Sequence, residues 1–167
     1  ASVPPSMGAA AEVGRGTTFS FMLALAPTDQ QVPDDRRSPD SAVIRGRTAI
    51  IVDDNATNLR VLELHLRNFG MFPVQATSPD EAIRHLQGAV RPDIVIMDMQ
   101  MPGEHGVDLA RRIRALPEGR FVPMVLFSSL HVSRSQITET DGGKEFAAFL
   151  VKPIKPSALL EAIGSAL

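Results

Sequence analysis

Three acids, a hydroxyl and an ammonium each follow directly after a short apolar run of the sequence. They are Asp53 with Asp54, Asp98, Ser128 and Lys152, after the runs at 49–52, 94–97, 124–127 and 149–151. Apolar character that is continuous rather than alternating is typical of strands buried on both faces of a parallel sheet. Because the carboxyl ends of parallel strands share one edge of a sheet, we expect these side chains to converge.

Converging carboxylates repel one another, by roughly 4 kcal/mol for two charges about 4 Å apart at an effective dielectric of about 20. The single charge of Lys152 does not neutralise three acids, so we expect a divalent cation to bind there. The set offers oxygen ligands and contains no His or Cys, which favours Mg²⁺ with several waters and a place for a phosphate oxygen. The sequence therefore predicts a magnesium site at this edge.

A carboxylate beside Mg²⁺, an ammonium and a hydroxyl can attack phosphorus and become an aspartyl phosphate. The metal and Lys152 would neutralise the charge that spreads over the phosphoryl oxygens in the transition state. We expect Asp98 to be the nucleophile, because it is the single acid at the end of a central strand. The adjacent pair Asp53 and Asp54 is the expected metal-binding side.

Amphipathic segments between the apolar runs predict the helices that complete the fold. Leucines at spacings of three and four predict a helix over 57–69, followed by Gly70 where a helix end takes a left-handed residue. The next helix begins at Ser78, the first residue of a capping box with proline at the first helical position. Two further helices are expected over 107–115 and 156–167.

A weaker strand at 71–74 carries Pro73, which cannot donate to a ladder and therefore belongs at an edge of the sheet. Strand and helix alternate five times along the chain, which requires right-handed crossovers. The predicted fold class is α/β, with a doubly wound parallel sheet.

The chain divides by composition into a tail, a linker and a domain. Its 167 residues leave room for one ordinary domain and a tail. Prolines among polar residues predict a flexible linker over 26–46, and the dense apolar pattern places the domain at 47–167. Within 1–25, alternation through Phe19 and Phe21 predicts a strand without a sheet in its own chain. This orphan strand and the initial Ala indicate a fragment of a longer polypeptide.

The bulk composition excludes several classes of function. Seventeen Lys plus Arg against nineteen Asp plus Glu give a net charge of −2, so no positive field draws the chain onto nucleic acid. The absence of cysteine excludes disulfides, thiolate metal sites and cysteine nucleophiles. No apolar run approaches the roughly 20 residues that cross a bilayer, so no membrane contact is expected.

Four motifs together resemble the receiver domain of two-component response regulators and hybrid histidine kinases, over residues 47–167. They are Ile51-Val52-Asp53-Asp54-Asn55, Asp98-Met99-Gln100-Met101-Pro102 with Gly106, Ser128, and Lys152-Pro153. The resemblance implies a flavodoxin-like receiver fold, with a five-stranded parallel sheet in the order 2-1-3-4-5.

The same resemblance implies a role for each residue of the site. Asp98 is the implied phosphoacceptor. The implied metal is Mg²⁺, bound by Asp54, Asp98 and the backbone carbonyl of Gln100, with Asp53 acting through water.

Three further positions carry the implied switch. Ser128 is the hydroxyl that follows the phosphoryl group, and Lys152 is its cationic clamp. Phe149 takes the place of the aromatic residue that swings inward when Ser128 moves. The bond from Lys152 to Pro153 is expected to be cis.

The segment 14–19 resembles the last glycine box and closing strand of a histidine-kinase ATP-binding domain, which makes 1–25 a remnant of that domain. The implied partners are the phosphohistidine donor domain of a kinase and a downstream histidine phosphotransfer protein. The implied location is the cytoplasm, for a free protein or for the cytoplasmic part of a membrane-anchored kinase. The fragment lacks the remaining ATP-binding boxes, so we expect it neither to bind ATP nor to phosphorylate itself.

The main alternative is a pseudo-receiver, a docking module that acts without phosphorylation. The complete acidic set, with Ser128 and Lys152, speaks against it. A haloacid-dehalogenase-like phosphatase needs a second acid two residues after the nucleophile, where Gln100 stands. A flavodoxin relative needs a hydroxyl-rich phosphate loop, whereas Asp53 and Asp54 would repel phosphate.

Two other segments carry weaker predictions. The stretch 129–143 is rich in Ser and Thr and contains a Gly pair, so the fourth helix of the domain is expected to be short or mobile. Arg111, Arg112 and Arg114 lie on one predicted helix and are interpreted as a solvated face rather than a phosphate-binding stripe.

Overall fold

The computed structural model describes residues 6–12, 16–22, 39–89, 91–128 and 143–167. The chain splits into two compact units, Ala1–Pro33 and Asp34–Leu167, and each is described by itself. None of the helices in these described ranges is long and apolar enough to cross a membrane.

The N-terminal unit contains an antiparallel hairpin of β1 (Ser6–Glu12) and β2 (Gly16–Met22), which pair along their whole length. The strand predicted from the alternation of Phe19 and Phe21 is therefore present. The expectation that it has no partner in its own chain was wrong. The partner β1 contains three consecutive alanines, and their small side chains give no alternating pattern to detect in the sequence.

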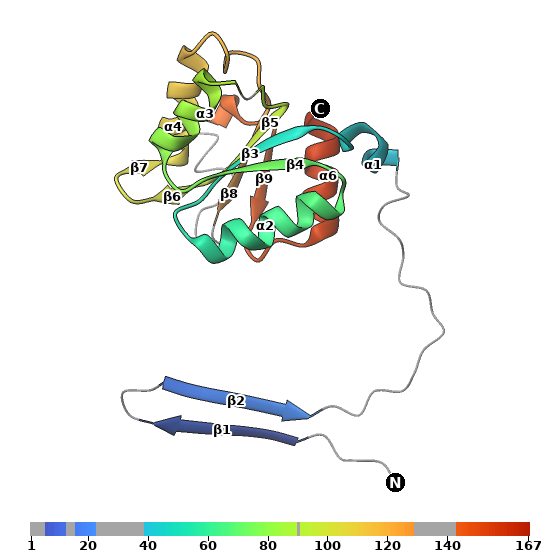
Figure 1. Ribbon diagram of the computed structural model, residues 1–167, viewed down its shortest axis with the longest axis vertical. Helices are drawn as coiled ribbons and strands as arrows, with labels where there is room; N and C mark the ends of the chain where they lie inside the picture. The colour runs from blue at the N-terminus through green and yellow to red at the C-terminus, as the bar shows by residue number, and fades with distance from the viewer. Residues whose placement is uncertain (1–5, 13–15, 23–38, 90, 129–142) are drawn as a thin grey trace. The chain divides into compact units, whose positions relative to one another are not determined.

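The C-terminal unit is built on a five-stranded parallel sheet (Figure 1). Its strands in chain order are β3 (Thr48–Val52), β4 (Phe72–Ala76), β5 (Ile94–Asp98), β8 (Met124–Ser128) and β9 (Ala148–Val151). Their spatial order is β4-β3-β5-β8-β9, which confirms the expected order 2-1-3-4-5. Every residue of β5 and β8 is buried, as their continuous apolar runs predict for central strands.

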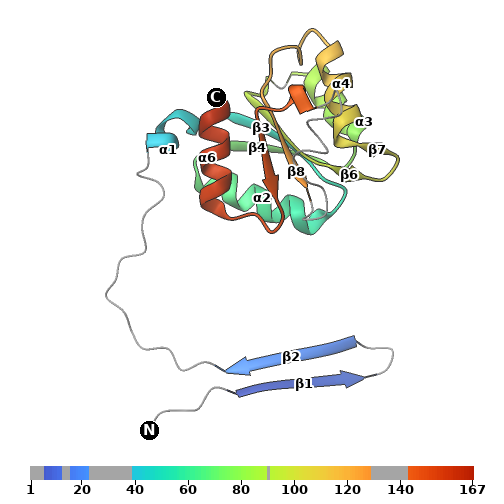
Figure 2. The ribbon, with the colours of Figure 1, turned by 180° about the vertical axis from the view of Figure 1, so that it is seen from behind.

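Helices cover both faces of this sheet and define two apolar cores. The helices are α2 (Ala56–Asn68) and α6 (Pro156–Ala166) on one face, and α3 (Pro79–Gln87) and α4 (Gly106–Ala115) on the other. Seen from behind, α6 lies beside the edge strand β9 (Figure 2). This is the doubly wound layer that the alternation of strand and helix predicts.

The helix ends follow the expected local chemistry. Gly70 has φ +81°, which confirms the left-handed residue expected after α2. Ser78 is the N-cap of α3, and its side chain accepts a hydrogen bond from the N–H of Glu81. The Glu81 carboxylate in turn accepts from the N–H of Thr77 at 2.6 Å, one residue earlier than the usual capping box.

A short helix, α1 (Pro39–Ile44), lies inside the range predicted as a flexible linker. Ile44 is fully buried and belongs to the core shared with α2 and α6. The folded unit therefore begins before residue 47, where composition placed its start. Six residues are too few for a helical periodicity to stand out from proline-rich surroundings.

The edge strand β4 carries Pro73, as predicted, and pairs on one side with β3. Two short strands, β6 (Gln100–Met101) and β7 (Glu104–His105), form a small hairpin after β5. A 3₁₀ turn, η2 (Gly143–Glu145), precedes β9. The stretch 129–143, where a short or mobile helix was predicted, lies outside the described residues except for its last residue.

Two of the three arginines of α4 lie on a solvated face, as predicted, and the third does not. Arg112 is exposed and pairs with Asp80 at 2.8 Å. Arg111 is exposed and pairs with Asp108 at 3.1 Å. Arg114 is instead largely covered. Its guanidinium donates to the carboxylate of Glu145 and to the carbonyls of Gly119, Val122 and Glu145, at 2.7–2.9 Å.

Candidate functional site

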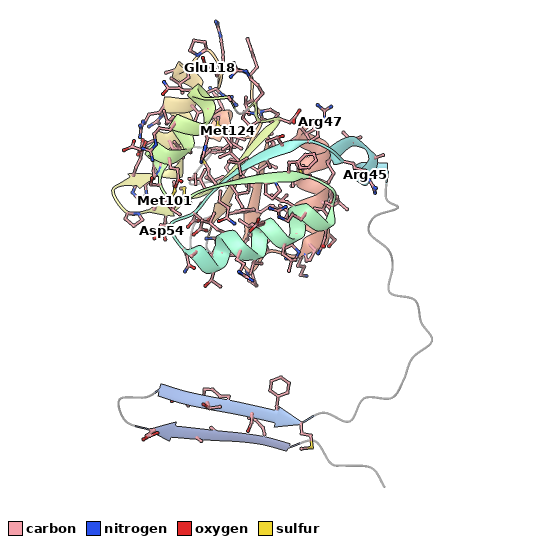
Figure 3. All side chains as sticks on the ribbon, in the orientation of Figure 1. Arg45, Arg47, Asp54, Met101, Glu118 and Met124 are labelled. Atoms are coloured by element: carbon pink, nitrogen blue, oxygen red, sulfur yellow. The ribbon has the colours of Figure 1, made fainter. Side chains whose placement is uncertain are left out.

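The residues expected to converge lie at the carboxyl edge of the sheet. Asp53 and Asp54 follow β3, while Asp98 and Ser128 are the last residues of β5 and β8, and Lys152 follows β9. The parallel registers bring these strand ends level with one another. In Figure 3, Asp54 and Met101 mark this end of the sheet, and Arg45 and Arg47 mark the other.

The three acids form a compact cluster. Carboxylate oxygens of Asp53, Asp54 and Asp98 lie within 4.8 Å of one another, with Asp53 and Asp98 buried and Asp54 exposed. The ammonium of Lys152 lies 3.0 Å from Oδ1 of Asp98 and 3.2 Å from Oδ2 of Asp53. One lysine thus contacts two of the three acids. The cluster carries more negative than positive charge, as the sequence predicts.

The pKa of Lys152 reflects this position. Partial burial acts to lower it, but the hydrogen bonds and negative charges of Asp98 and Asp53 outweigh burial and raise the pKa above its ordinary value. The side chain therefore remains a full positive charge at neutral pH, available to an anion bound between the acids.

Asp53 is held by donors at the start of α2. Its Oδ1 accepts from the N–H of Asn55 at 2.8 Å, and the side-chain amide of Asn58 lies 3.0–3.1 Å from both of its oxygens. Asp53 and Asp54 could instead have capped α2, but another residue does so. Asn55 is the N-cap of α2 and accepts from the N–H of Thr57 at 2.9 Å.

Asn58 is the residue of this site that sequence analysis missed. An asparagine in the first turn of a helix is common and carries no chemistry by type alone. A usable signal was its position five residues after Asp53. Side chains in the first turn of a helix point back toward the helix N-terminus, and therefore toward the loop that carries Asp53.

The chain after Asp98 is tightly fixed. The β6–β7 hairpin is closed by a hydrogen bond from the N–H of Gly106 to the carbonyl of Met99, at 2.9 Å. A Cβ at position 106 would stand 2.4 Å from the carbonyl oxygen of Asp98, so only glycine fits there. Pro102 and Gly103 are exposed at the hairpin tip, where Gly103 has φ +84°.

The remaining predicted residues belong to β8, to β9 and to the hairpin that follows β5. Ser128 is buried, and its carbonyl accepts from the N–H of Lys152 at 2.9 Å. Gln100 begins β6, two residues after Asp98. Phe149 in β9 packs against Phe146, with ring centroids 5.5 Å apart. The bond between Lys152 and Pro153 is cis, as expected.

The donor set fits a magnesium ion. It consists of carboxylate oxygens close enough to share one cation, with Asp54 open to the waters that Mg²⁺ retains. Among the residues that the structure describes, no His joins this cluster, and the chain has no Cys, so the ligands that favour zinc are missing.

Comparisons with known proteins point to one family. The profile of the response regulator receiver domain matches residues 49–164. The chain is 33% identical over 110 residues to the probable transcriptional regulator ycf27 of Guillardia theta, covering 66% of this chain and 41% of the relative. It is 38% identical over 90 residues to histidine kinase 3 of Arabidopsis thaliana, covering 52% of this chain and 9% of that kinase. The chain thus spans less than half the length of either relative.

Solved structures agree with this similarity. The receiver domain of a sensor histidine kinase from Pseudomonas aeruginosa, with a magnesium ion coordinated in its active-site cleft, is 27% identical with a TM-score of 0.63, over 72% of this chain and 97% of that one. The chemotaxis response regulator CheY4 of Vibrio cholerae is 24% identical with a TM-score of 0.64, over 73% and 99% of the two chains. The second likeness supports the fold alone.

Proposed function

The chain belongs to the response regulator receiver domain family, and from this we propose that it takes a phosphoryl group from a phosphohistidine onto Asp98 and changes conformation in response. It is a receiver domain of two-component signalling. The observation that carries the proposal is the geometry around Asp98. A buried carboxylate at the end of a central strand lies 3.0 Å from an ammonium and within 4.8 Å of two further acids.

In the proposed reaction an oxygen of Asp98 attacks phosphorus while the bond from phosphorus to the donor histidine nitrogen breaks. The electron pair of that bond stays on the imidazole, which then takes a proton from solvent. Lys152 presents its charge to the phosphoryl oxygens, where negative charge is spread in the transition state. Mg²⁺ bound by Asp54, Asp98 and the Gln100 carbonyl, with Asp53 acting through water, would neutralise further charge there.

We assign the response to the two strands beside Asp98. Ser128, at the end of β8, is the proposed hydroxyl that moves toward the phosphoryl group. Phe149 is the proposed aromatic residue that turns inward behind it. The partial burial of Phe149 beside Phe146 supports this assignment, because the ring already lies against the core on one side.

We also propose a setting for the domain. The similarity to a histidine kinase and to the receiver domain of another favours a hybrid kinase. The proposed partners are a phosphohistidine donor and a downstream histidine phosphotransfer protein, and the proposed location is the cytoplasm. The hairpin of β1 and β2 is the proposed closing piece of the kinase ATP-binding domain, and 26–38 the proposed linker.

Phosphorylation with acetyl phosphate and Mg²⁺ tests the proposal. We expect intact-mass measurement to show one added phosphoryl group on the parent protein and none on Asp98→Asn. Chelation of Mg²⁺ should also prevent the addition. An unchanged mass of the folded parent protein would refute phosphoryl acceptance and favour the pseudo-receiver, which docks a partner without phosphorylation.

A further inference from the structure

Asp53 accepts hydrogen bonds from the protein on both carboxylate oxygens. Oδ1 is 2.8 Å from the N–H of Asn55 and 3.1 Å from the side-chain amide of Asn58. Oδ2 is 3.0 Å from the same amide and 3.2 Å from the ammonium of Lys152. A carboxylate offers about four lone-pair sites, so these contacts use nearly all of its accepting capacity.

The amide of Asn58 is itself fixed in place. Asn58 is the third residue of α2, and its backbone N–H donates to the side chain of the N-cap Asn55. Side chains in a helix point back toward the N-terminus, so the amide reaches across the first turn to Asp53. Two of the three donors to Asp53 therefore come from one capped helix start, and the third comes from Lys152 across the sheet edge.

We propose that Asn58 is a positioning residue that occupies the oxygens of Asp53 and keeps this acid out of direct contact with the cation. The inference rests on the proposed function, because it concerns the same metal site. Asp54, which is exposed, and Asp98 remain as the direct carboxylate ligands. Asp53 stays in one orientation, paired with Lys152, and acts on the cation through water.

Loss of the amide should therefore move metal affinity and phosphorylation in opposite directions. In Asn58→Leu, Asp53 loses the side-chain amide that contacts both of its oxygens, while the N–H of Asn55 still holds Oδ1. Oδ2 then becomes free to bind Mg²⁺ directly. We expect the affinity for Mg²⁺ to rise about tenfold, the size expected for one hydrogen bond to a charged group. The rate of phosphorylation at saturating Mg²⁺ should fall, because Asp53 no longer holds Lys152 beside Asp98.

The experiment uses the full chain and two readouts. Calorimetric titration with MgCl₂, without phosphodonor, gives the affinity, and the rate of mass gain with acetyl phosphate gives the reactivity. Asn58→Ala repeats the test with a smaller side chain. Asn68→Leu is the matched control, since Asn68 is an exposed asparagine at the other end of α2 and should change neither readout.

A comparison in a second background separates positioning from simple structural damage. In an Asp53→Ala background, Asn58→Leu should leave the Mg²⁺ affinity unchanged, because the acid it acts on is gone. Weaker Mg²⁺ binding together with slower phosphorylation, or no change in either, would overturn the proposal. If the parent protein itself neither binds Mg²⁺ nor gains a phosphoryl group, the proposed function fails as well.

A measurement on the unaltered protein covers the case in which neither variant folds. The side-chain amide protons of Asn58 should be protected from exchange, by nuclear magnetic resonance, both without and with saturating Mg²⁺. Loss of that protection when Mg²⁺ binds would show that Asp53 leaves Asn58 for the metal, which contradicts the proposal.

Discussion

The two ends of the parallel sheet differ in how their charges are balanced. At the carboxyl edge, three acids share a single lysine, and their oxygens crowd within 4.8 Å. At the amino edge, two arginines each pair with a single acid: Arg47 bonds Asp93 at 2.7 Å, and Arg114 bonds Glu145 at 2.9 Å.

This difference indicates that one edge of the sheet is suited to binding and the other to stabilising the fold. Repulsion among the acids at the carboxyl edge favours a bound cation, but it works against folding. The amino edge makes the opposite contribution, because Arg114 joins the segment before β8 to the turn before β9 through four hydrogen bonds of 2.7–2.9 Å. Substitutions at the two edges should therefore differ in sign.

The largest expected effect is at Arg114. Arg114→Ala removes the donor for four backbone carbonyls and one carboxylate. We therefore expect the free energy of unfolding to fall by about 3 kcal/mol, measured by urea denaturation. Mg²⁺ affinity should not change. Arg111→Ala is the control, with an expected loss below about 0.5 kcal/mol, because its ion pair is exposed. Equal losses in the two variants would contradict the assigned role.

A second substitution tests the amino edge with a smaller change. The carboxylate of Asp93 accepts from Arg47 at 2.7 Å and from the N–H of Thr48 at 2.8 Å. Asp93→Asn keeps one acceptor but removes the charge, so we expect a loss of about 1–2 kcal/mol in the same denaturation experiment. An unchanged or increased stability would mean that this edge gains nothing from charge pairing.

The same chemical change at the carboxyl edge should have the opposite sign. Asp54→Asn removes one of the three crowded acids, and we expect a gain of about 1 kcal/mol in Mg²⁺-free buffer. The difference from the parent should shrink or reverse as MgCl₂ is added, because the cation stabilises the parent by mass action. A destabilised Asp54→Asn without metal would argue against repulsion at this edge.

The smallest effect concerns Glu81, an acid outside the cluster although it follows the end of β4. Hydrogen bonds from the backbone N–H and hydroxyl of Thr77 hold the pKa of Glu81 below its ordinary value. An acid with a lowered pKa adds stability above its unfolded-state pKa and loses it as the pH falls through the folded value. Glu81→Gln should thus cost at most about 0.5 kcal/mol at pH 7.

That cost should vanish in acid, which urea midpoints measured from neutral pH downward will check. A cost independent of pH would mean that the charge of Glu81 is irrelevant. A stabilising effect would mean that repulsion extends along the carboxyl edge beyond the three clustered acids.

The sequence was sufficient for the sheet and for the meeting of the acids with Lys152. Continuous apolar runs identify buried parallel strands, and parallel strands place their carboxyl ends together whatever the detailed packing. The polar residues after those runs were therefore predictable as a group, before any coordinates placed Asp98 beside Lys152.

Features that depend on single side-chain geometries were not predictable in this way. The amide of Asn58 matters because the start of α2 aims it at Asp53, and the carbonyls that Arg114 contacts lie up to 31 residues away. The helix α1 and the alanine-rich β1 are too short or too uniform to produce a period. Local pattern identifies elements, whereas these features arise only when elements pack.

The closed base of the β6–β7 hairpin makes its tip a convenient attachment point. Gly106 locks the base beside Asp98, while Pro102 and Gly103 at the tip face solvent. A peptide inserted between these two residues would be joined to the end of β5 through the fixed base of the hairpin, without shifting the strand that carries Asp98. The loop thus offers a place to build a fluorescent reporter of metal or phosphoryl occupancy.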